Sequence, residues 1–569
     1  MKKIGGGVVA LLVLACVALV GIGGGMTYMY QDDFQAVMGT KQSQKTAQLL
    51  PEETQLYMAF TPNVQAISGY ENLKALYLDN PEIKAILDNA EKEILIEGDS
   101  QVNIREDILP WLGTEVVIAM PHFADAVAEE TDDAPDVIIS MQSRDLSASN
   151  TFVENEVNNT KGEPFVSEEY QGVTLNTQPQ TNNEYDEMTI ATVDDLVIMS
   201  SNKDFIKSMI DKAKGSDTKS LVDNPNYAKI VSEMPTNGIS IMYIEISGMM
   251  DTILAEADMP LPPDIAQNMQ AFKAVAMTGL LEADGILFNM IVNFDVDMLS
   301  EDMKAAMKQE PSSNNILMHI PADALFSMNS LSLQRVWEQT KISLEANPDF
   351  AETMTDFEQE LGLNIDEDIF SWMTGEYAFV GVEAEPIDEY SPPVGGYMLI
   401  GSTDVGDAQT KVQKIVDVML EQTGGFIEFE PATVQGIEVN SAVMQSFDPD
   451  SAGEPTGAYY GFHNDYFISA YPEDAVKALG NASQNSLADD ASFKAIQPRL
   501  PSNNSGYIYF NFDKLRPMVE ENMSPGENAE YDETVRPFLE PVHIMVVSNS
   551  TEGLEDGVAK GSIFFLITE

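Results

Sequence analysis

The sequence predicts an α+β protein made of two tandem copies of an antiparallel-sheet-plus-helices domain after one N-terminal transmembrane helix. Three observations predict this fold class: a long uncharged run at the N-terminus, an ordered internal repeat, and short alternating apolar segments joined by acidic loops. Period-two alternation and hairpin-like closures favour antiparallel sheets over parallel βαβ units. With 569 residues, 44% of them hydrophobic, the chain is large enough to bury several cores.

The N-terminal residues 1–30 are predicted to be a signal-anchor. Two lysines precede an uncharged run of 27 residues, Ile4–Tyr30, and two aspartates follow it. About 20 apolar residues span a bilayer, and basic residues before the span place the N-terminus in the cytoplasm. We therefore expect a single-pass protein of the cell membrane, with the bulk of the chain extracytoplasmic, in the periplasm or at the cell surface.

Two alternatives to an uncleaved anchor stay open. A cleaved signal peptide has a shorter apolar core of about 7–15 residues. A lipoprotein signal would use Val13-Leu14-Ala15-Cys16 as its lipobox, although the apolar run continues to Val20. Cys16 is the only cysteine, so the chain has no intramolecular disulfide and no cysteine-based zinc site.

A polar stalk is predicted at residues 31–48. After it, matching segments recur in the same order at separations of about 260–270 residues, which indicates an internal repeat. The matched pairs are Leu50-Pro51 with Ile320-Pro321, Asn80-Pro81 with Asn347-Pro348, Asp107–Glu115 with Asp368–Glu376, Gln171-Gly172 with Gln435-Gly436, and Ser220-Leu221 with Ser486-Leu487. The order of the matches predicts one α+β repeat at residues 49–310, a linker at 311–318 and a second repeat at 319–569.

Each repeat is predicted to contain strands and helices in one order. Asn before Pro predicts a helix start, because Asn caps and Pro suits the first helical position. The expected strands are 56–60, 116–120, 137–140, 239–244, 276–281 and 286–294 in the first repeat, and 325–328, 377–380, 397–400, 507–510, 544–547 and 561–567 in the second. Further helices are expected at 203–214 and 473–479.

The charge excludes several classes of partner. The chain carries 92 acidic and 30 basic side chains, a formal net charge of −62. Nucleic-acid binding requires clustered Lys and Arg, and so does recruitment to an anionic lipid surface through a basic patch. We therefore expect no nucleic-acid partner, and membrane attachment only through the N-terminal helix.

The most specific local pattern is Asp-x-x-x-Trp-x-x-x-Glu, which occurs at Asp107–Glu115 and at Asp368–Glu376. A functional interpretation pairs the two carboxylates of each copy for acid–base chemistry or a cation. The structural interpretation has Asp capping a short helical turn and Trp111 or Trp372 packing that turn on the sheet. The structural interpretation is favoured, because position-matched tryptophans are expected of a shared core.

No other pattern predicts a site. Asp448–Gly453 approaches the start of a calcium loop but lacks the third oxygen ligand and the later Glu. The 31 methionines are attributed to core packing. The four histidines, His122, His319, His463 and His543, have no metal-ligand spacing. Nucleophile and phosphate-loop motifs are missing. We therefore predict no catalytic residue, no cofactor-binding residue, no metal site and no cofactor.

The chain resembles a bacterial family of unknown function, the DUF3352 proteins. The resemblance rests on the N-terminal membrane segment, on Leu50-Pro51 followed by Tyr57, and on the D-I-L-P-W-L-G element at Asp107–Gly113. The second repeat departs from that element at Ser371 and Thr374. The resemblance implies an exported, membrane-anchored bacterial protein and implies no activity.

The expected function is that of a non-enzymatic, envelope-associated binding module. Its partner would be an envelope protein, an envelope polymer or an apolar ligand. Abundant carboxylates leave an alternative open, a carboxylate-based extracytoplasmic hydrolase or a calcium-dependent binding module.

The acidic excess predicts a dependence of stability on salt. Self-repulsion destabilises a highly charged chain, and salt screens it, because the Debye length falls from about 10 Å at 0.1 M to about 3 Å at 1 M. We expect the melting temperature to rise with NaCl, as in proteins of saline habitats. Sucrose stabilises without screening charge and is the control; a melting temperature that is unchanged in NaCl would exclude salt adaptation.

Overall fold

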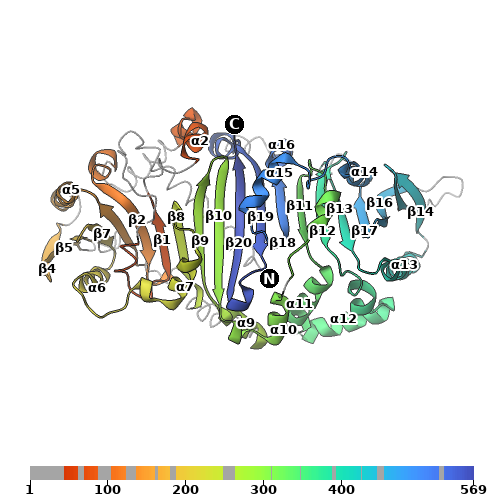
Figure 1. Ribbon diagram of the computed structural model, residues 1–569, viewed down its shortest axis with the longest axis horizontal. Helices are drawn as coiled ribbons and strands as arrows, with labels where there is room; N and C mark the ends of the chain where they lie inside the picture. The colour runs from red at the N-terminus through yellow and green to blue at the C-terminus, as the bar shows by residue number, and fades with distance from the viewer. Residues whose placement is uncertain are drawn as a thin grey trace.

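The described residues form an α+β fold built on one antiparallel sheet of twenty strands (Figure 1). The computed structural model describes residues 44–61, 69–86, 104–123, 136–159, 164–179, 188–247, 263–308, 310–345, 348–386, 393–424, 426–444, 454–523 and 531–568. The predicted α+β class and the antiparallel pairing are confirmed. The predicted anchor lies outside the described residues, and none of the described helices is long and apolar enough to cross a membrane.

Ten strands of the N-terminal half run from one edge of the sheet to its middle in the order β4, β5, β6, β7, β3, β2, β1, β8, β9, β10. Their bounds are β1 Leu56–Phe60, β2 Leu112–Met120, β3 Ile138–Ser143, β4 Val166–Tyr170, β5 Val173–Gln178, β6 Met188–Val193, β7 Leu196–Ser200, β8 Ser240–Glu245, β9 Phe272–Glu282 and β10 Gly285–Phe294. All six strands expected here from the sequence are present.

The C-terminal half repeats this order from the opposite edge: β14, β15, β16, β17, β13, β12, β11, β18, β19, β20. The bounds are β11 Phe326–Ser330, β12 Tyr377–Glu383, β13 Val394–Gly401, β14 Ile427–Val434, β15 Ile437–Met444, β16 Glu454–His463, β17 Tyr466–Tyr471, β18 Asn504–Asn511, β19 Val542–Ser550 and β20 Val558–Ile567. Each strand therefore has a counterpart at the same place in the other half.

The helices of the described residues fill the connections between strands. In the N-terminal half they are α2 Tyr70–Leu73, η1 Lys74–Leu78, η2 Ile104–Ile108, α5 Leu146–Asn159, α6 Lys203–Ala213, η3 Leu221–Asp223, α7 Pro225–Glu233, α9 Pro263–Ala271, η4 Val296–Met298 and α10 Glu301–Met307. In the C-terminal half they are η5 Asn315–His319, α11 Leu333–Glu345, α12 Pro348–Leu361, η6 Ile365–Phe370, α13 Val405–Gln422, α14 Glu473–Ala482, α15 Ala491–Ile496, η7 Gln497–Arg499, α16 Phe512–Asn522, α18 Arg536–Leu539 and η8 Leu554–Asp556. A further helical turn covers 81–86, where the Asn80 side chain accepts from the Glu82 amide as expected for a cap.

The last strands of the two halves, β10 and β20, pair with each other. The antiparallel ladder runs from Gly285 opposite Leu566 to Asn293 opposite Val558. The sheet therefore continues without a break across the predicted domain boundary.

Polar contacts join the halves beside this ladder. The Asp284 carboxylate in the turn before β10 lies 2.6 Å from the Arg499 guanidinium of η7. In the opposite direction, Glu233 of α7 binds the Lys560 amine of β20 at 2.8 Å. Each half thus holds the terminal hairpin of the other.

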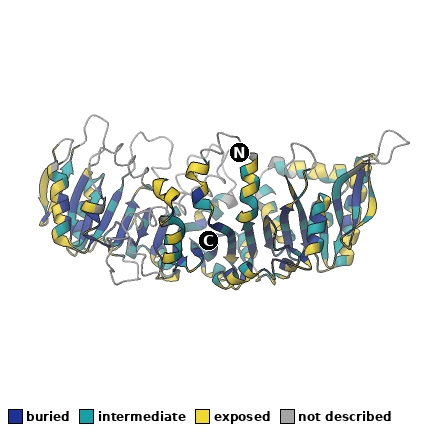
Figure 2. Cartoon of the chain, turned by 90° about the horizontal axis from the view of Figure 1, so that it is seen from above, coloured by how far each residue is buried: buried dark blue, intermediate teal, exposed yellow. Residues whose placement is uncertain are grey.

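The two faces of the sheet are covered differently. Face A carries the odd-numbered side chains of β10, such as Ile291, and is covered by α6 and α7 in one half and by α14 and α15 in the other. Face B carries the even-numbered side chains of β10, such as Met290. Figure 2 shows that buried residues follow the strands along the whole molecule, while exposed residues gather on the helices.

The two predicted core tryptophans lie on face B, near opposite ends of the sheet. Trp111 is 1% exposed and packs on Phe152 of α5, with ring centroids 5.4 Å apart. Trp372 is 3% exposed and packs in a cluster with Val412 and Val416 of α13, the counterpart of α5. The structural interpretation of both tryptophans is confirmed.

Two segments predicted to be polar spacers are packed where the structure describes them. In the predicted stalk, 31–48, Thr46 and Ala47 are fully buried. In the predicted linker, 311–318, Ile316 and Leu317 are buried in the C-terminal core. Polar residues of these segments bond to the carboxylates of Glu115 and Glu376, while their apolar neighbours enter the cores.

Replacing Trp111 with Ala should destabilise the protein by about 3–5 kcal/mol, because a fully buried aromatic leaves a cavity. Chemical denaturation followed by fluorescence of the remaining tryptophans measures the loss. Phe357, which is 44% exposed on α12, provides the control, since Phe357→Ala should change stability by about 0.5 kcal/mol or less. Equal effects of the two substitutions would contradict a core role for Trp111.

Candidate functional site

The glutamates of the two Asp-x-x-x-Trp-x-x-x-Glu elements accept hydrogen bonds from backbone amides, Glu376 at the start of η5 and Glu115 in the turn at residues 45–49. Glu376 accepts hydrogen bonds from the Asn314 amide at 2.6 Å and the Ile316 amide at 3.1 Å, where η5 begins. The fully buried Glu115 accepts from the amide and the hydroxyl of Thr46, both at 3.3 Å. Carboxylates stabilise helix starts in this way, because they satisfy amides that lack a partner in the helix.

The aspartates of the same elements do not face these glutamates. The Asp107 carbonyl accepts from Trp111 Nε1 at 2.6 Å, and the Asp368 carboxylate accepts from the Asn364 amide at 2.8 Å. Asp368 also pairs with Lys414, and its pKa is lowered by these bonds against the raising effect of burial. The paired-carboxylate interpretation thus gains no geometric support.

One electrostatic interaction between carboxylates was not anticipated from the sequence. Burial raises the pKa of Glu156 on α5, and the charge of Asp107 raises it further. No motif in the sequence marks this pair.

The structure brings two of the four histidines together. The rings of His319 and His463 are 5.8 Å apart, and Tyr466 lies 5.0 Å from His319. Burial lowers the pKa of both imidazoles, and for His319 the neighbouring His463 lowers it further. Across the described ranges no group of three or more His, Cys, Asp or Glu could hold a metal ion. The candidate calcium loop Asp448–Gly453 lies outside them.

Face B at the middle of the sheet carries a cross-strand row of apolar side chains in each half. In the N-terminal half the paired residues, from β2 to β10, are Ile118, Met58, Met242, Met277 and Met290. In the C-terminal half the row, from β12 to β20, is Phe379, Met328, Ile508, Val547 and Ile563. An antiparallel sheet with one solvated face would carry polar side chains here. Both rows are therefore expected to be shielded from water by a segment packed against them.

The N-terminal row is covered by a helical segment that we name the cover helix, α2 with η1, residues 70–78. Met242 and Met277 are 3% and 2% exposed and share a core cluster with Tyr70 of this segment. The cover helix also reaches the other half, since the Asn72 amide group donates to the Ile567 carbonyl at 3.0 Å and the Tyr77 hydroxyl to the Phe538 carbonyl at 3.1 Å.

The C-terminal row is more exposed. Ile508 and Val547 are partly exposed, whereas their counterparts Met242 and Met277 are buried. Met328 and Phe379 are partly exposed, as their counterparts Met58 and Ile118 are. The difference between the two rows therefore lies at β18 and β19. Phe326, at the counterpart of the buried Leu56, is 36% exposed.

We name the face-B side chains of β11, β12, β18 and β19 the open face. The α16 helix packs where β18 ends and β19 begins, with Asp513 2.7 Å from His543, so it covers one end of this surface.

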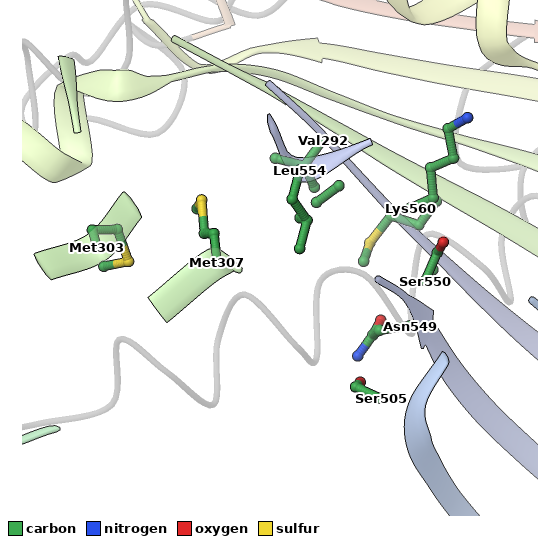
Figure 3. Close-up of a pocket in the computed structure, with 11 residues that line it drawn as sticks. Val292, Met303, Met307, Ser505, Asn549, Ser550, Leu554 and Lys560 are labelled. Atoms are coloured by element: carbon green, nitrogen blue, oxygen red, sulfur yellow. The ribbon is translucent and has the colours of Figure 1, made fainter. Parts of the chain in front are cut away.

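A pocket of about 270 Å³ lies beside the open face, under α10 (Figure 3). Met303 and Met307 of α10 lie on one side of it, and Ser505, Asn549 and Ser550 lie on the other. Ala559 and Gly561 of β20 also line it. The Lys560 amine points away and binds Glu233 on face A.

The pocket exists because small residues replace large ones at matching positions. Met290 and Ile563 occupy the same place in the two rows. Two residues earlier in each strand, Gly561 corresponds to Phe288, and four residues earlier Ala559 corresponds to Ile286. Phe288 and Ile286 are each 3% exposed in the N-terminal cluster. Ser505 stands near the counterpart of the buried Ile239. The same scaffold thus encloses a packed core on one side of the β10–β20 ladder and a hollow on the other.

The α11 helix follows β11 in the chain, just as the cover helix follows β1. Unlike the cover helix, α11 does not pack over the central row of its half. The Trp337 ring of α11 stacks on Phe370 of η6 with centroids 4.5 Å apart, and its Nε1 donates to Asp366 Oδ1 at 2.7 Å. The α11 helix also contacts α10 and α12. It is therefore held beside the sheet and leaves the open face partly exposed.

Sequence reasoning missed the open face, although a signal was present. The run Tyr507–Phe510 and the run Ile544–Val547 are apolar at every position, which is typical of strands that are buried on both faces. Such strands require cover on both sides. What the sequence could not reveal is that one face lacks the helix that its counterpart has.

A family model described as "Protein of unknown function (DUF3352)" matches residues 12–567. No curated protein matches the chain. Among solved structures, crystal forms I, III and IV of TP0453 are similar at 12%, 12% and 14% identity, with TM-scores of 0.25, 0.24 and 0.23. The matches cover 46%, 46% and 43% of this chain and 82%, 84% and 79% of those chains. Such TM-scores support no inference about fold or function.

Proposed function

The chain belongs to the DUF3352 family, whose description gives no activity, and on that premise we propose that it is a membrane-anchored extracytoplasmic binding module. The observation that carries the proposal is the open face, a partly exposed apolar surface at the middle of the sheet. Monomeric proteins rarely leave large contiguous apolar patches exposed unless they bind something there. Methionine side chains adapt to varied apolar partners, which suits a binding surface.

The two-repeat organisation belongs to the same proposal. Two copies of one unit, at residues 49–310 and 319–569, account for the repeated strand order and for the matched places of Trp111 and Trp372. One copy then keeps its cover, and the other presents the surface to a partner. The chemical work is binding and not catalysis.

The alternative remains a carboxylate-based hydrolase or a calcium-dependent module. Its support is the abundance of acidic residues and the pKa of Glu156, which is raised by burial and by the charge of Asp107. Turnover of a glycan or ester panel, or calcium-dependent binding, would favour it.

Topology is tested by protease treatment of intact cells and of spheroplasts. With the anchor at residues 4–30 and the N-terminus inside, the large C-terminal part should be digested while cytosolic control proteins stay intact. Protection of that part, when a known surface protein is cut, would contradict the extracytoplasmic location.

Accessibility of the open face is tested with the neutral apolar dye Nile red. We expect the wild-type chain to bind dye and Val547→Glu to bind several-fold less, because a carboxylate on the open face disfavours an apolar ligand. Val166 is 61% exposed on edge strand β4, so Val166→Glu is the matched control and should leave dye binding unchanged. Equal dye signals from both variants would count against the proposed function.

A further inference from the structure

We propose that the open face and its pocket bind an amphipathic α-helix of a partner protein, placed on the C-terminal half as the cover helix is placed on the N-terminal half. The inference rests on the proposed binding function and names the class of partner. Helix-in-groove recognition uses an apolar stripe on the ligand helix and an apolar surface on the receptor.

The cover helix is an example of such a ligand within the chain. Its side chains Tyr70, Leu73, Leu76 and Tyr77 all belong to or pack against the core cluster of face B. Their spacing of three, three and one residues places them on one side of a helix. The N-terminal half therefore shows which apolar pattern this scaffold accepts over its central strands.

The C-terminal half has the same strands and register but more room. A partner helix lying over Ile508 and Val547 would have the pocket at its side, next to α10, where Ala559 and Gly561 replace large side chains. The pocket volume, about 270 Å³, compares with the ~30 Å³ that one water occupies in the liquid. It has room for a large apolar anchor side chain of the kind that dominates helix recognition.

The rim of the pocket suits a helix as well. Met303 and Met307 on α10 can adjust their rotamers to the incoming side chain. Asn549, Ser505 and Ser550 offer hydrogen bonds to polar groups at the edge of the apolar stripe. The lining is thus apolar at its floor and polar at one side.

Charge complementarity defines the polar side of the partner. The chain has a net charge of −62. The helices α10 and α16 carry charges of both signs, since Glu301 pairs with Lys304 at 2.9 Å and α16 carries Lys514 and Arg516 as well as Glu521. The attraction of a basic ligand therefore comes from the field of the whole chain. A helix with a basic polar side would be attracted, and an acidic one repelled. The partner is therefore a basic amphipathic helix.

The test uses the full chain in lipid nanodiscs and a fluorescent peptide with the sequence of residues 69–79, the cover helix and its flanks. A second peptide carries Lys in place of Glu71 and Asp79. Fluorescence anisotropy should show binding of both, with the basic peptide about 10-fold tighter at low salt. The difference should shrink as NaCl screens the charges.

Pocket variants test the location. Ala559→Ile and Ser505→Ile introduce the residue type that the N-terminal half carries and should weaken binding by about 10-fold or more. Ala559→Ser, which changes polarity but little volume, is the matched control and should bind as the wild type does. Melting temperatures establish that each variant is folded.

Methyl NMR of labelled methionines gives a readout on the wild-type chain. Met328 and Met545 lie on the open face, and their methyl resonances should shift when the peptide is added. Met209, fully buried under face A, should not shift. Assignment by Met→Leu substitution identifies the three signals.

Several outcomes would overturn the inference. In the peptide titrations, these are no binding of either peptide, or binding that Ala559→Ile leaves unchanged. In the NMR experiment, they are shifts confined to methionines outside the open face, or the same shifts caused by nanodisc lipid alone. A wild-type dimer that the pocket variants dissociate would also contradict the inference. If Nile red still distinguishes Val547→Glu from Val166→Glu while the peptides fail, the helical partner is wrong and the binding function stands. If the dye also fails, both are wrong.

Discussion

The antiparallel pairing of β10 with β20 is the constraint on which the rest of the structure depends. The ladder spans nine residue pairs, from Gly285–Leu566 to Asn293–Val558, and turns two sheets into one. Gly285 stands at its end, where a Cβ would lie only 2.0 Å from the Phe565 carbonyl oxygen, so the close approach of the strands requires glycine. The ladder also removes what would be the most exposed edge of each half, which is how sheets avoid edge-to-edge aggregation.

Because the joined strands are counterparts, the ladder places equivalent surfaces on either side of a pseudo-two-fold relation. On one side the large residues Ile286 and Phe288 and the cover helix close face B. On the other, Ala559 and Gly561 leave a hollow and α11 is held against η6 by Trp337. The scaffold is shared, and a few side-chain volumes decide whether a position is a core or a binding surface. In the proposed function, the packed side of the ladder contributes stability and the other side contributes the binding surface.

The sequence was enough to predict twelve of the twenty strands, because apolar alternation and Asn-Pro helix starts depend on neighbours along the chain. It also predicted the buried tryptophans, since both occur at matched places in the repeat. The continuous sheet and the packed residues Thr46 and Ile316 were not predictable in the same way. They depend on partners distant in sequence: Glu115 for Thr46, and Glu376 for Ile316. The open face was missed for a related reason, since apolar strands indicate that cover is needed but not which segment supplies it.

The net negative charge of the chain affects which molecules can bind the apolar open face. A partly exposed apolar face favours association with a second copy of the same chain, yet two copies would bring two charges of −62 together. Like-charge repulsion opposes that encounter at moderate salt, while a basic ligand is attracted by the net negative charge of the chain. In the proposed function, the same surface charge opposes self-association and favours a basic partner, so an apolar surface is compatible with an otherwise highly hydrated protein.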